Sequence, residues 1–177
     1  MCDAHITCEE AIYNFDMAAF YTKWTHDMIE AQKQDGSVPD TVSPYWQTYP
    51  ADPAWGTACI IVPWYLYIYY GDERILKESY QLMKGWIDFL GTQTKNYIVQ
   101  YSKYGDWLTP GEVTIDEKLG RYFYKPISTP GELVSTWFYA LGTLLLSKIA
   151  RILGKTAEAE EYAKLFERIK EAFNRSS

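Results

Sequence analysis

Two segments of the chain are too apolar along their whole length to face water, and each is followed by a segment that is apolar on one side only. The apolar segments are residues 55–70 and 133–153. In 72–90 and 162–173 the apolar side chains recur at spacings of three and four, which predicts amphipathic helices. Because an amphipathic helix covers a buried one, this order predicts an all-α protein of paired inner and outer helices. A short strand over residues 97–101 is the one exception.

Tight turns join the two helices of each pair. Gly71-Asp72 and Gly154-Lys155-Thr156 each combine a glycine that ends a helix with a polar residue that starts the next. Residues 4–34 form a similar pair if residues 14–16 interrupt them, with Asp16 capping the second helix. Three such pairs describe an arc of an α/α toroid.

The connections between the pairs are long, at residues 35–54 and 94–128. Loops of this length in a compact domain are usually functional, and their richness in Trp, Tyr and Pro argues against disorder. If inner and outer helices alternate, both loops emerge where the inner helices begin. Thr129-Pro130 then supplies the N-cap and first-turn proline of the last inner helix.

Each long loop carries a cluster of tryptophan and aspartate, Asp52-Pro53-Ala54-Trp55-Gly56 and Gly105-Asp106-Trp107-Leu108. An indole packs on the C–H face of a pyranose and a carboxylate accepts hydrogen bonds from its hydroxyls, so this composition is typical of a carbohydrate site. Asp3, Asp52 and Asp106 are the acids that this hypothesis favours. The alternative is that the indoles are core and the aspartates cap helices or form turns. The candidates for stacking on a sugar are Tyr45, Trp46, Tyr49, Trp55, Trp107, Tyr122 and Tyr124.

The net charge of −6, without any run of Lys or Arg, argues against nucleic acid or an anionic membrane as the main partner. The cysteines Cys2, Cys8 and Cys59 lack metal-site or redox spacing and are interpreted as reduced packing residues. His5 and His26 stand apart from other ligand types, so neither a metal nor a cofactor is predicted. Phosphate-binding and serine-nucleophile motifs are absent as well. The first residues lack the pattern of a signal peptide, so a cytoplasmic location is expected.

A series of short motifs resembles, in order and spacing, the six-hairpin domain of bacterial α-L-rhamnosidases of glycoside hydrolase family 78. The resemblance runs nearly end to end and implies that about three of the six hairpins of an (α/α)6 barrel are present. Residues 1–177 are then a partial barrel domain, truncated at both ends. The motifs are Asp3-Ala4-His5-Ile6, Tyr13-Asn14-Phe15-Asp16, Asp35-Gly36-Ser37-Val38-Pro39, Trp55-Gly56-Thr57-Ala58, Pro63-Trp64, Tyr70-Gly71-Asp72, Gly105-Asp106-Trp107 and Thr129-Pro130-Gly131-Glu132-Leu133-Val134.

The resemblance implies hydrolysis of terminal α-L-rhamnose with inversion, by an acid and a base standing roughly 6.5 to 9.5 Å apart. The family's two catalytic glutamates would fall outside residues 1–177. Within the chain, Asp3 would bind sugar hydroxyls, Trp55 and Trp107 would form the apolar wall, and Asp106 would lie nearby. Thr57 departs from the family pattern, since many members carry Asp there, so a polar contact to sugar at this position is in doubt.

The isolated chain is therefore expected to bind an L-rhamnose-containing glycoside weakly and to hydrolyse nothing. Half a toroid also leaves two apolar edges without neighbours, and such patches favour self-association. Two alternatives remain at this point. One is a non-catalytic helical sugar-binding or scaffold module, and the other is a toroid glycosidase acting on glucosides.

Overall fold

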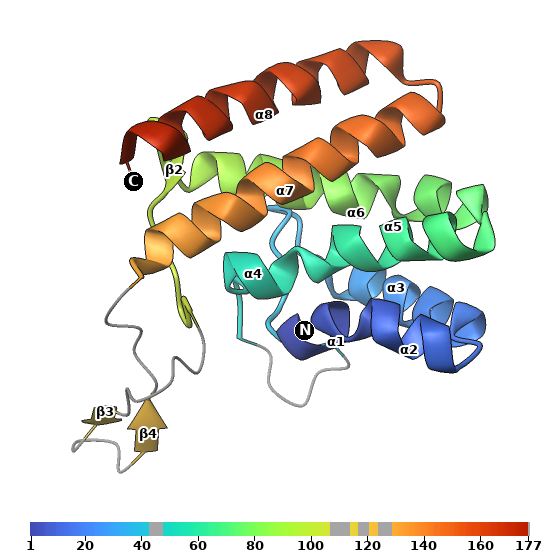
Figure 1. The fold of residues 1–177 in the computed structure, drawn as a ribbon, viewed down its shortest axis with the longest axis horizontal. Helices are drawn as coiled ribbons and strands as arrows, with labels where there is room; N and C mark the ends of the chain where they lie inside the picture. Colours follow the sequence, from blue (N-terminus) through green and yellow to red (C-terminus); the bar gives the residue numbers. More distant parts are fainter. Residues whose placement is uncertain (43–47, 107–113, 117–120, 124–128, 177) are drawn as a thin grey trace.

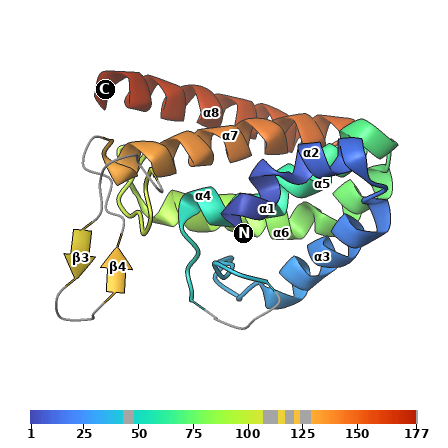
Figure 2. The same ribbon diagram turned by 60° about the horizontal axis from the view of Figure 1, so that its bottom comes forward.

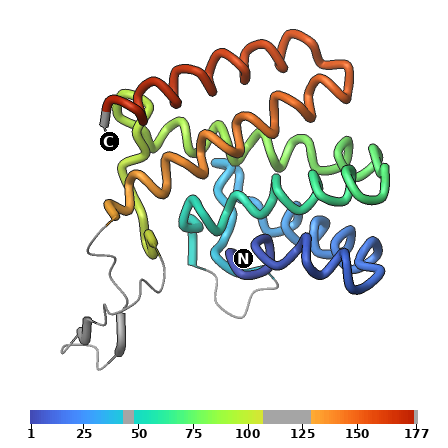
Figure 3. The backbone as a smooth tube through the Cα atoms, viewed as in Figure 1, coloured from blue at the N-terminus to red at the C-terminus, as the bar shows by residue number. Residues whose placement is uncertain are grey.

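The computed structural model describes residues 1–42, 48–106, 114–116, 121–123 and 129–176. Three helical hairpins lie side by side across this part of the chain, which confirms the predicted arc (Figures 1 and 3). The elements are α1 (Cys2–Ile6), α2 (Cys8–Asn14), α3 (Ala18–Ala31), α4 (Pro53–Gly56), α5 (Ala58–Tyr70), α6 (Glu73–Thr92), β1 (Thr94–Lys95), β2 (Ile98–Val99), β3 (Thr114–Asp116), β4 (Arg121–Phe123), α7 (Gly131–Ile152) and α8 (Thr156–Ser176).

The hairpins form an inner and an outer layer. In the inner layer α5 contacts α1 and α2 on one side and α7 on the other. In the outer layer α6 contacts α3, and two of its side chains reach α8: the Tyr80 hydroxyl donates to Glu158, and Lys84 donates to the Tyr162 hydroxyl. The predicted pairing of buried inner helices with amphipathic outer ones is confirmed.

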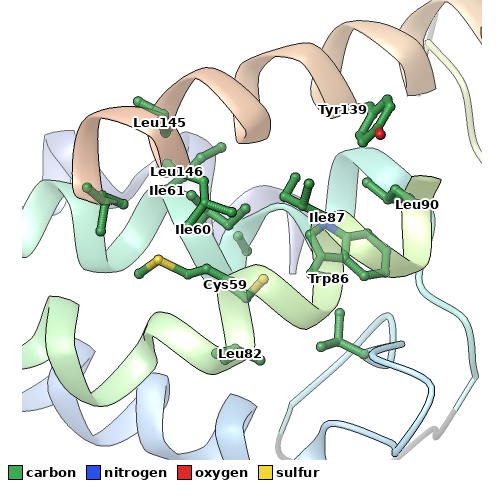
Figure 4. Packing of buried hydrophobic residues seen from close by; sticks show 14 of the residues in the cluster. Cys59, Ile60, Ile61, Leu82, Trp86, Ile87, Leu90, Tyr139, Leu145 and Leu146 are labelled. Carbon is green, nitrogen blue, oxygen red and sulfur yellow. The ribbon is translucent and has the colours of Figure 1, made fainter. Parts of the chain in front are cut away.

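The main core lies where α5, α6 and α7 meet (Figure 4). Ile60, Ile87 and Leu146, one from each helix, have no or almost no exposed surface. Burying one such side chain stabilises the fold by roughly 1.5–3 kcal/mol. Gly142 allows α7 to come close, because a Cβ there would lie 3.0 Å from Ile87 Cδ1 and 3.2 Å from Ile60 Cδ1. A larger residue at position 142 would push the three helices apart.

Local sequence signals set the turn between α5 and α6 as predicted. Gly71 adopts the left-handed conformation (φ 69°) that ends α5. Asp72 then caps α6, accepting hydrogen bonds from the backbone N–H groups of Arg74 and Ile75. At the break expected within residues 14–16, α2 ends at Asn14, and the Asp16 carboxylate accepts the N–H of Ala18 at the start of α3. The turn at Gly71-Asp72 and the break between α2 and α3 are confirmed, because they rest on residues a few positions apart. The predicted cap of α3 was wrong by one residue: Met17 is the N-cap, and Asp16 stands just before it.

Two helix starts differ from the prediction. The segment expected as one helix over 55–70 is divided at Thr57 into α4 and α5, and α4 begins earlier, at Pro53. The predicted start of α7 was wrong by one residue: Pro130 rather than Thr129 is the N-cap, so no side chain caps this helix. Proline has an extended ψ of 128° there, and its own carbonyl accepts the N–H of Leu133.

Two small antiparallel hairpins interrupt the long loop before α7. In the first, β1 pairs with β2 through a two-residue turn in which Asn96 and Tyr97 have positive φ (51° and 66°). The predicted strand over 97–101 is therefore confined to residues 98–99. The second hairpin, β3 with β4, was not predicted, because strands of three residues show too little alternation to be recognised.

The inner helices begin at one end of the arc, which we call the loop end. Figures 1 and 2 show α1, α4 and α7 starting there, and the β3–β4 hairpin projecting from it. The opposite end, with the short connections at Gly71 and Gly154, is called the turn end. The predicted grouping of both long loops at one end is confirmed.

Among the described residues, α7 is long and apolar enough to cross a membrane by length and composition. Within the protein, 56% of its apolar window is buried against neighbouring elements. A core helix passes the same composition test, and the packing of α7 against α5, α6 and α8 corresponds to the buried helix expected from the sequence.

Candidate functional site

Asp52 joins the two tryptophan-bearing loops at the loop end. It is 1% exposed, and its Oδ1 caps α4 by accepting the N–H of Ala54 at 2.9 Å. Its Oδ2 accepts hydrogen bonds from the backbone N–H groups of Lys103 (2.6 Å) and Tyr104 (3.1 Å), and from the Ser102 hydroxyl (3.3 Å). The capping role proposed as the alternative is confirmed. The same carboxylate also holds a loop fifty residues further along the chain.

Asp40 is a second buried carboxylate in the same network, at 2% exposure. Its Oδ1 accepts the N–H of Asp52 at 2.8 Å. Its Oδ2 accepts hydrogen bonds from the Thr48 hydroxyl (2.6 Å), Lys103 Nζ (2.9 Å) and the Tyr104 hydroxyl (3.1 Å). With Lys103 as counter-ion and donors at both oxygens, this buried charge is compensated. We refer to Asp40, Asp52, Lys103 and Tyr104 as the carboxylate brace.

The brace places an aromatic pair at the start of α4. The ring centroids of Trp55 and Tyr104 lie 4.4 Å apart, with the planes inclined by 32°. Burial, with the Asp40 carboxylate next in effect, raises the pKa of Tyr104 to about 12, so its hydroxyl keeps the proton that it donates. Trp55 is half-buried, so part of its indole remains exposed at the loop end.

The predicted neighbour Asp106 follows directly after this anchored segment. The Gly105 N–H donates to the Ser102 hydroxyl, and its positive φ (58°) turns the chain. Asp106 itself is exposed at the loop end. Trp107 lies outside the described residues. The Gly105-Asp106 segment thus directly follows Tyr104, the residue whose ring packs on Trp55.

Asp3 lies on α1, in a different part of the same end. It is exposed and lines an open cleft of about 500 Å³, shared with side chains of α3 that include Phe20 and Trp24. Residues 41 and 42 close the cleft, where the Trp24 indole N–H donates to the Val42 carbonyl. The described lining of this cleft does not include Trp55 or Tyr104.

His5 ties α1 to both neighbouring inner helices. Its Nε2 lies 2.9 Å from the carbonyl oxygen of Ala54, and because a carbonyl only accepts, Nε2 carries the proton. The ring also meets Phe138 of α7 edge-on, at 5.7 Å between centroids. Burial lowers the pKa of His5 to about 4, so the imidazole is neutral near pH 7. The sequence argued only that His5 is not a metal ligand. Nothing in it indicated that His5 joins α1 to the neighbouring helices.

Thr57, the departure from the family pattern, has its hydroxyl committed inside the protein. The hydroxyl donates to the Pro53 carbonyl at 2.7 Å and accepts the Trp86 indole N–H at 3.2 Å. Gly56 precedes it because the Trp86 ring lies against the backbone: a Cβ at Gly56 would come within 2.3 Å of that ring. Thr57 therefore joins α4 to α6, and contact with a sugar is not its role here.

Most of the remaining stacking candidates lie outside the described part of the chain. Tyr45, Trp46 and Tyr124 are outside it altogether, and of Tyr122 only the backbone, in β4, is placed. Tyr49 is described and has a structural role. Its hydroxyl donates to the Ala31 carbonyl, and Lys33 Nζ lies 3.9 Å from its ring centroid, so it fastens the first long loop to α3.

Within the described part of the chain, no group of three or more His, Cys, Asp or Glu side chains is arranged to hold a metal ion. The three cysteines are free thiols there. Burial raises the pKa of Cys8 to about 11 and that of Cys59 still further, so both favour the unreactive protonated form.

Sequence reasoning missed Asp40, Lys103 and Tyr104. Asp40 and Lys103 carry no local signal, because their partners are 8 to 64 residues away. Tyr104 stands three residues before Trp107, and its place beside the Gly105-Asp106-Trp107 motif was the signal that could have revealed it. The assembled surface offers an aromatic platform beside exposed carboxylate, an arrangement that can bind a pyranose.

The family model described as the bacterial α-L-rhamnosidase six-hairpin glycosidase domain matches residues 1–176. Among curated proteins, an α-L-rhamnosidase of Alteromonas sp. is 34% identical over 162 residues, covering 90% of this chain and 17% of the relative. One from Formosa agariphila is 29% identical over 171 residues, covering 97% and 18%. The chain thus spans less than a fifth of these relatives.

Solved structures agree with this assignment. The α-L-rhamnosidase from Dictyoglumus thermophilum superposes with a TM-score of 0.90 at 45% identity, over 98% of this chain and 18% of that one. The Streptomyces avermitilis α-L-rhamnosidase complexed with L-rhamnose superposes with a TM-score of 0.79 at 29% identity, over 98% and 15%. With the three-hairpin arc and its aromatic loop end, these matches show that the chain belongs to the bacterial α-L-rhamnosidase six-hairpin glycosidase family and forms part of such a catalytic domain.

Proposed function

We propose that the loop end forms one wall of the L-rhamnose pocket of an inverting α-L-rhamnosidase. The observation that carries the proposal is the joining of both tryptophan-bearing loops by Asp52, which sets Trp55 beside the segment leading to Asp106. A relative with the same fold has been solved with L-rhamnose bound, which supports this choice of sugar.

In this proposal Trp55 and Trp107 provide the apolar wall against the ring and its methyl group. Asp106 and Asp3 accept hydrogen bonds from sugar hydroxyls, and both carboxylates are exposed at the loop end as that role requires.

The same proposal gives the isolated chain no hydrolytic activity. Inverting hydrolysis needs one carboxyl to protonate the leaving oxygen and another to activate water. Asp40 and Asp52 are buried and both oxygens of each accept hydrogen bonds from neighbouring residues, so neither has the access to substrate that proton transfer requires. The catalytic acid and base are assigned to parts of the domain outside residues 1–177.

Titration of the chain with L-rhamnose, followed by tryptophan emission, tests the pocket. We expect a saturable change with L-rhamnose and a smaller one, or none, with D-glucose. Trp55→Ala should weaken the L-rhamnose response at least about tenfold, since stacking contributes on this scale. Trp137→Ala is the control, because this exposed indole on α7 lies outside both loops. Equal responses to both sugars, or an unaffected Trp55→Ala, would contradict the proposal.

Hydrolysis is tested with an aryl α-L-rhamnoside. The purified 177-residue chain is expected to release no aryl group above the buffer rate, and turnover by this chain would refute the assignment of the catalytic pair. The inverting outcome is read from a chain that spans the whole six-hairpin domain, by NMR of the first rhamnose anomer formed. A first product that retains the anomeric configuration of the substrate would exclude the inverting mechanism.

We also propose that the isolated chain self-associates through the open edge of its last hairpin. A groove of about 370 Å³ runs between α7 and α8, and its residues are largely apolar. Trp137, which borders it, is 51% exposed. The groove is lined by Trp137, Ala140, Leu141, Leu144, Phe166, Lys170, Phe173 and Asn174.

Sedimentation velocity over a range of concentrations tests this edge. The native chain should form dimers or larger species as concentration rises, and Trp137→Glu should shift it towards monomer. Ile68→Glu is a matched control, because Ile68 is equally exposed at 51% but lies at the turn end. A native chain that stays monomeric, or equal effects of both substitutions, would contradict the assignment.

A further inference from the structure

Tyr104 lies in a position that no motif assigns, between the buried carboxylates and the indole of Trp55. Its ring packs against the indole at 4.4 Å between centroids, and its hydroxyl donates to Asp40 Oδ2. Its backbone N–H donates to Asp52 Oδ2. One residue therefore contacts the aromatic wall through its ring and both buried acids through its polar atoms.

These contacts restrict the tyrosine from three directions. The N–H to Asp52 fixes the backbone, and the hydroxyl to Asp40 fixes the far end of the side chain. Asp40 cannot easily move, since it also accepts the N–H of Asp52 and pairs with Lys103 at 2.9 Å. A ring held at both ends is a rigid surface, and the indole packed on it has fewer orientations to lose when a ligand binds.

The chain direction gives the same residue a second effect. Gly105 and Asp106 follow Tyr104 directly, so the position of the exposed Asp106 carboxylate depends on where Tyr104 is held. The first loop meets the second here through contacts between residues about fifty positions apart in the sequence, among them the bond from Tyr104 to Asp52.

We propose that Tyr104 is a positioning residue of the sugar site: it fixes the orientation of the Trp55 indole and couples the two tryptophan-bearing loops into one unit. The effect of Tyr104 on sugar affinity rests on the proposed rhamnose pocket. Its effect on the orientation of the Trp55 indole is independent of that proposal. Asp40 acts through the Tyr104 hydroxyl, and neither residue takes part in bond making or breaking.

The test uses the 177-residue chain labelled with 5-fluorotryptophan, in which the ¹⁹F resonance of Trp55 is identified by its loss in Trp55→Phe. In Tyr104→Leu we expect this resonance to shift and broaden, and L-rhamnose affinity to fall about tenfold. Tyr104→Phe keeps the ring and should restore most of the affinity, while the loss of the bond to Asp40 should still broaden the Trp55 resonance.

Tyr80→Leu is the matched control. Like Tyr104, Tyr80 donates its hydroxyl to a carboxylate at 3.1 Å, in this case Glu158, but it lies between the outer helices α6 and α8. It should lower stability without changing the Trp55 resonance or the sugar affinity. If Tyr104→Leu does not fold, the proposal is tested by the Trp55 resonance in Tyr104→Phe and in Asp40→Asn, which should broaden in both.

An unchanged Trp55 resonance in the Tyr104 variants would overturn the proposal, as would a change of the same size in Tyr80→Leu. Failure of the pocket itself gives a different result: the native chain then shows no response to L-rhamnose, and the ¹⁹F resonance alone tests the positioning role.

Discussion

The two ends of the helix arc use the same residue type in the same local position, yet with different consequences. Asp72 at the turn end and Asp52 at the loop end both cap the helix that follows them. The bonds of Asp72 stay within the next three residues, and its side chain is 27% exposed. Asp52 is 1% exposed and also bonds residues 102–104. A cap is thus a local device at one end and a tertiary junction at the other.

The largest expected effect on stability comes from removing the cap at Asp52, and removal of the cap at Asp72 is the comparison. Asp52→Ala should lower the free energy of unfolding by about 3 kcal/mol, because it leaves the buried N–H of Ala54 and the partly buried N–H groups of Lys103 and Tyr104 without acceptors. Asp72→Ala should cost about 1 kcal/mol, the usual value for an N-cap. Urea unfolding measures both, and similar losses would remove the distinction between the two ends.

Glycine substitutions provide the next comparison. Gly56→Ala should cost about 1–3 kcal/mol, because the added Cβ would lie 2.3 Å from the buried Trp86 ring and the core must shift. In Gly71→Ala the added Cβ would have no atom within 4 Å. This substitution should destabilise the protein by about 1 kcal/mol, only because the backbone there is left-handed (φ 69°). Near-UV circular dichroism should change with the first substitution only. A change with Gly71→Ala would show that the turn end is also tightly packed.

A buried histidine, His5, makes the stability of the loop end depend on pH. The pKa of His5 is lowered in the folded state to about 4, so the unfolded chain binds a proton that the folded chain excludes. The stability from neutral His5 is full above pH 6.5 and is lost as pH falls towards 4, by up to about 3 kcal/mol.

Urea unfolding at several pH values measures this loss. His5→Gln should lessen the decline between pH 6.5 and 4. Parallel curves for His5→Gln and the native chain would refute the assignment of a buried neutral imidazole.

The smallest effect concerns thiol reactivity. Cys8 and Cys59 have no exposed surface, and burial raises the pKa of each, so both should resist a disulfide reagent at pH 8 until the chain unfolds. Cys2 is half-buried at the loop end and should react first, though slowly, because burial and Asp3 raise its pKa to about 11. Thiol titration with and without urea tests this order. Rapid labelling of Cys59 would indicate that the core between α5 and α6 opens.

The fold was predictable wherever its causes are local. The amphipathic period of α6, the glycine at 71 and the cap at 72 lie within one stretch of chain, and each was recognised from the sequence. The division of the apolar segment at Thr57 was not recognised from the sequence. At this position the Thr57 hydroxyl accepts a hydrogen bond from the indole of Trp86, which lies on another helix. The missed β3–β4 hairpin is too short to carry a pattern.

The candidate site was predictable only in part. Composition and the family resemblance pointed to Trp55 and Asp106, and the structure places their loops together. Asp3 was proposed with them, and it lines an open cleft with side chains of α3, so its part in sugar binding stays a prediction. Neither composition nor spacing could identify Asp40, since its hydrogen-bond partners come from residues 48, 52, 103 and 104.

The sequence by itself determined the alternation of inner and outer helices, the turns between them and the end at which the long loops emerge. These follow from periodicity and from backbone preferences, which act over a few residues. The tertiary structure alone decided which polar groups are buried together and therefore how the aromatic wall is held. Buried carboxylates must be satisfied by whatever donors the fold brings to them, and those donors lie far away in the chain.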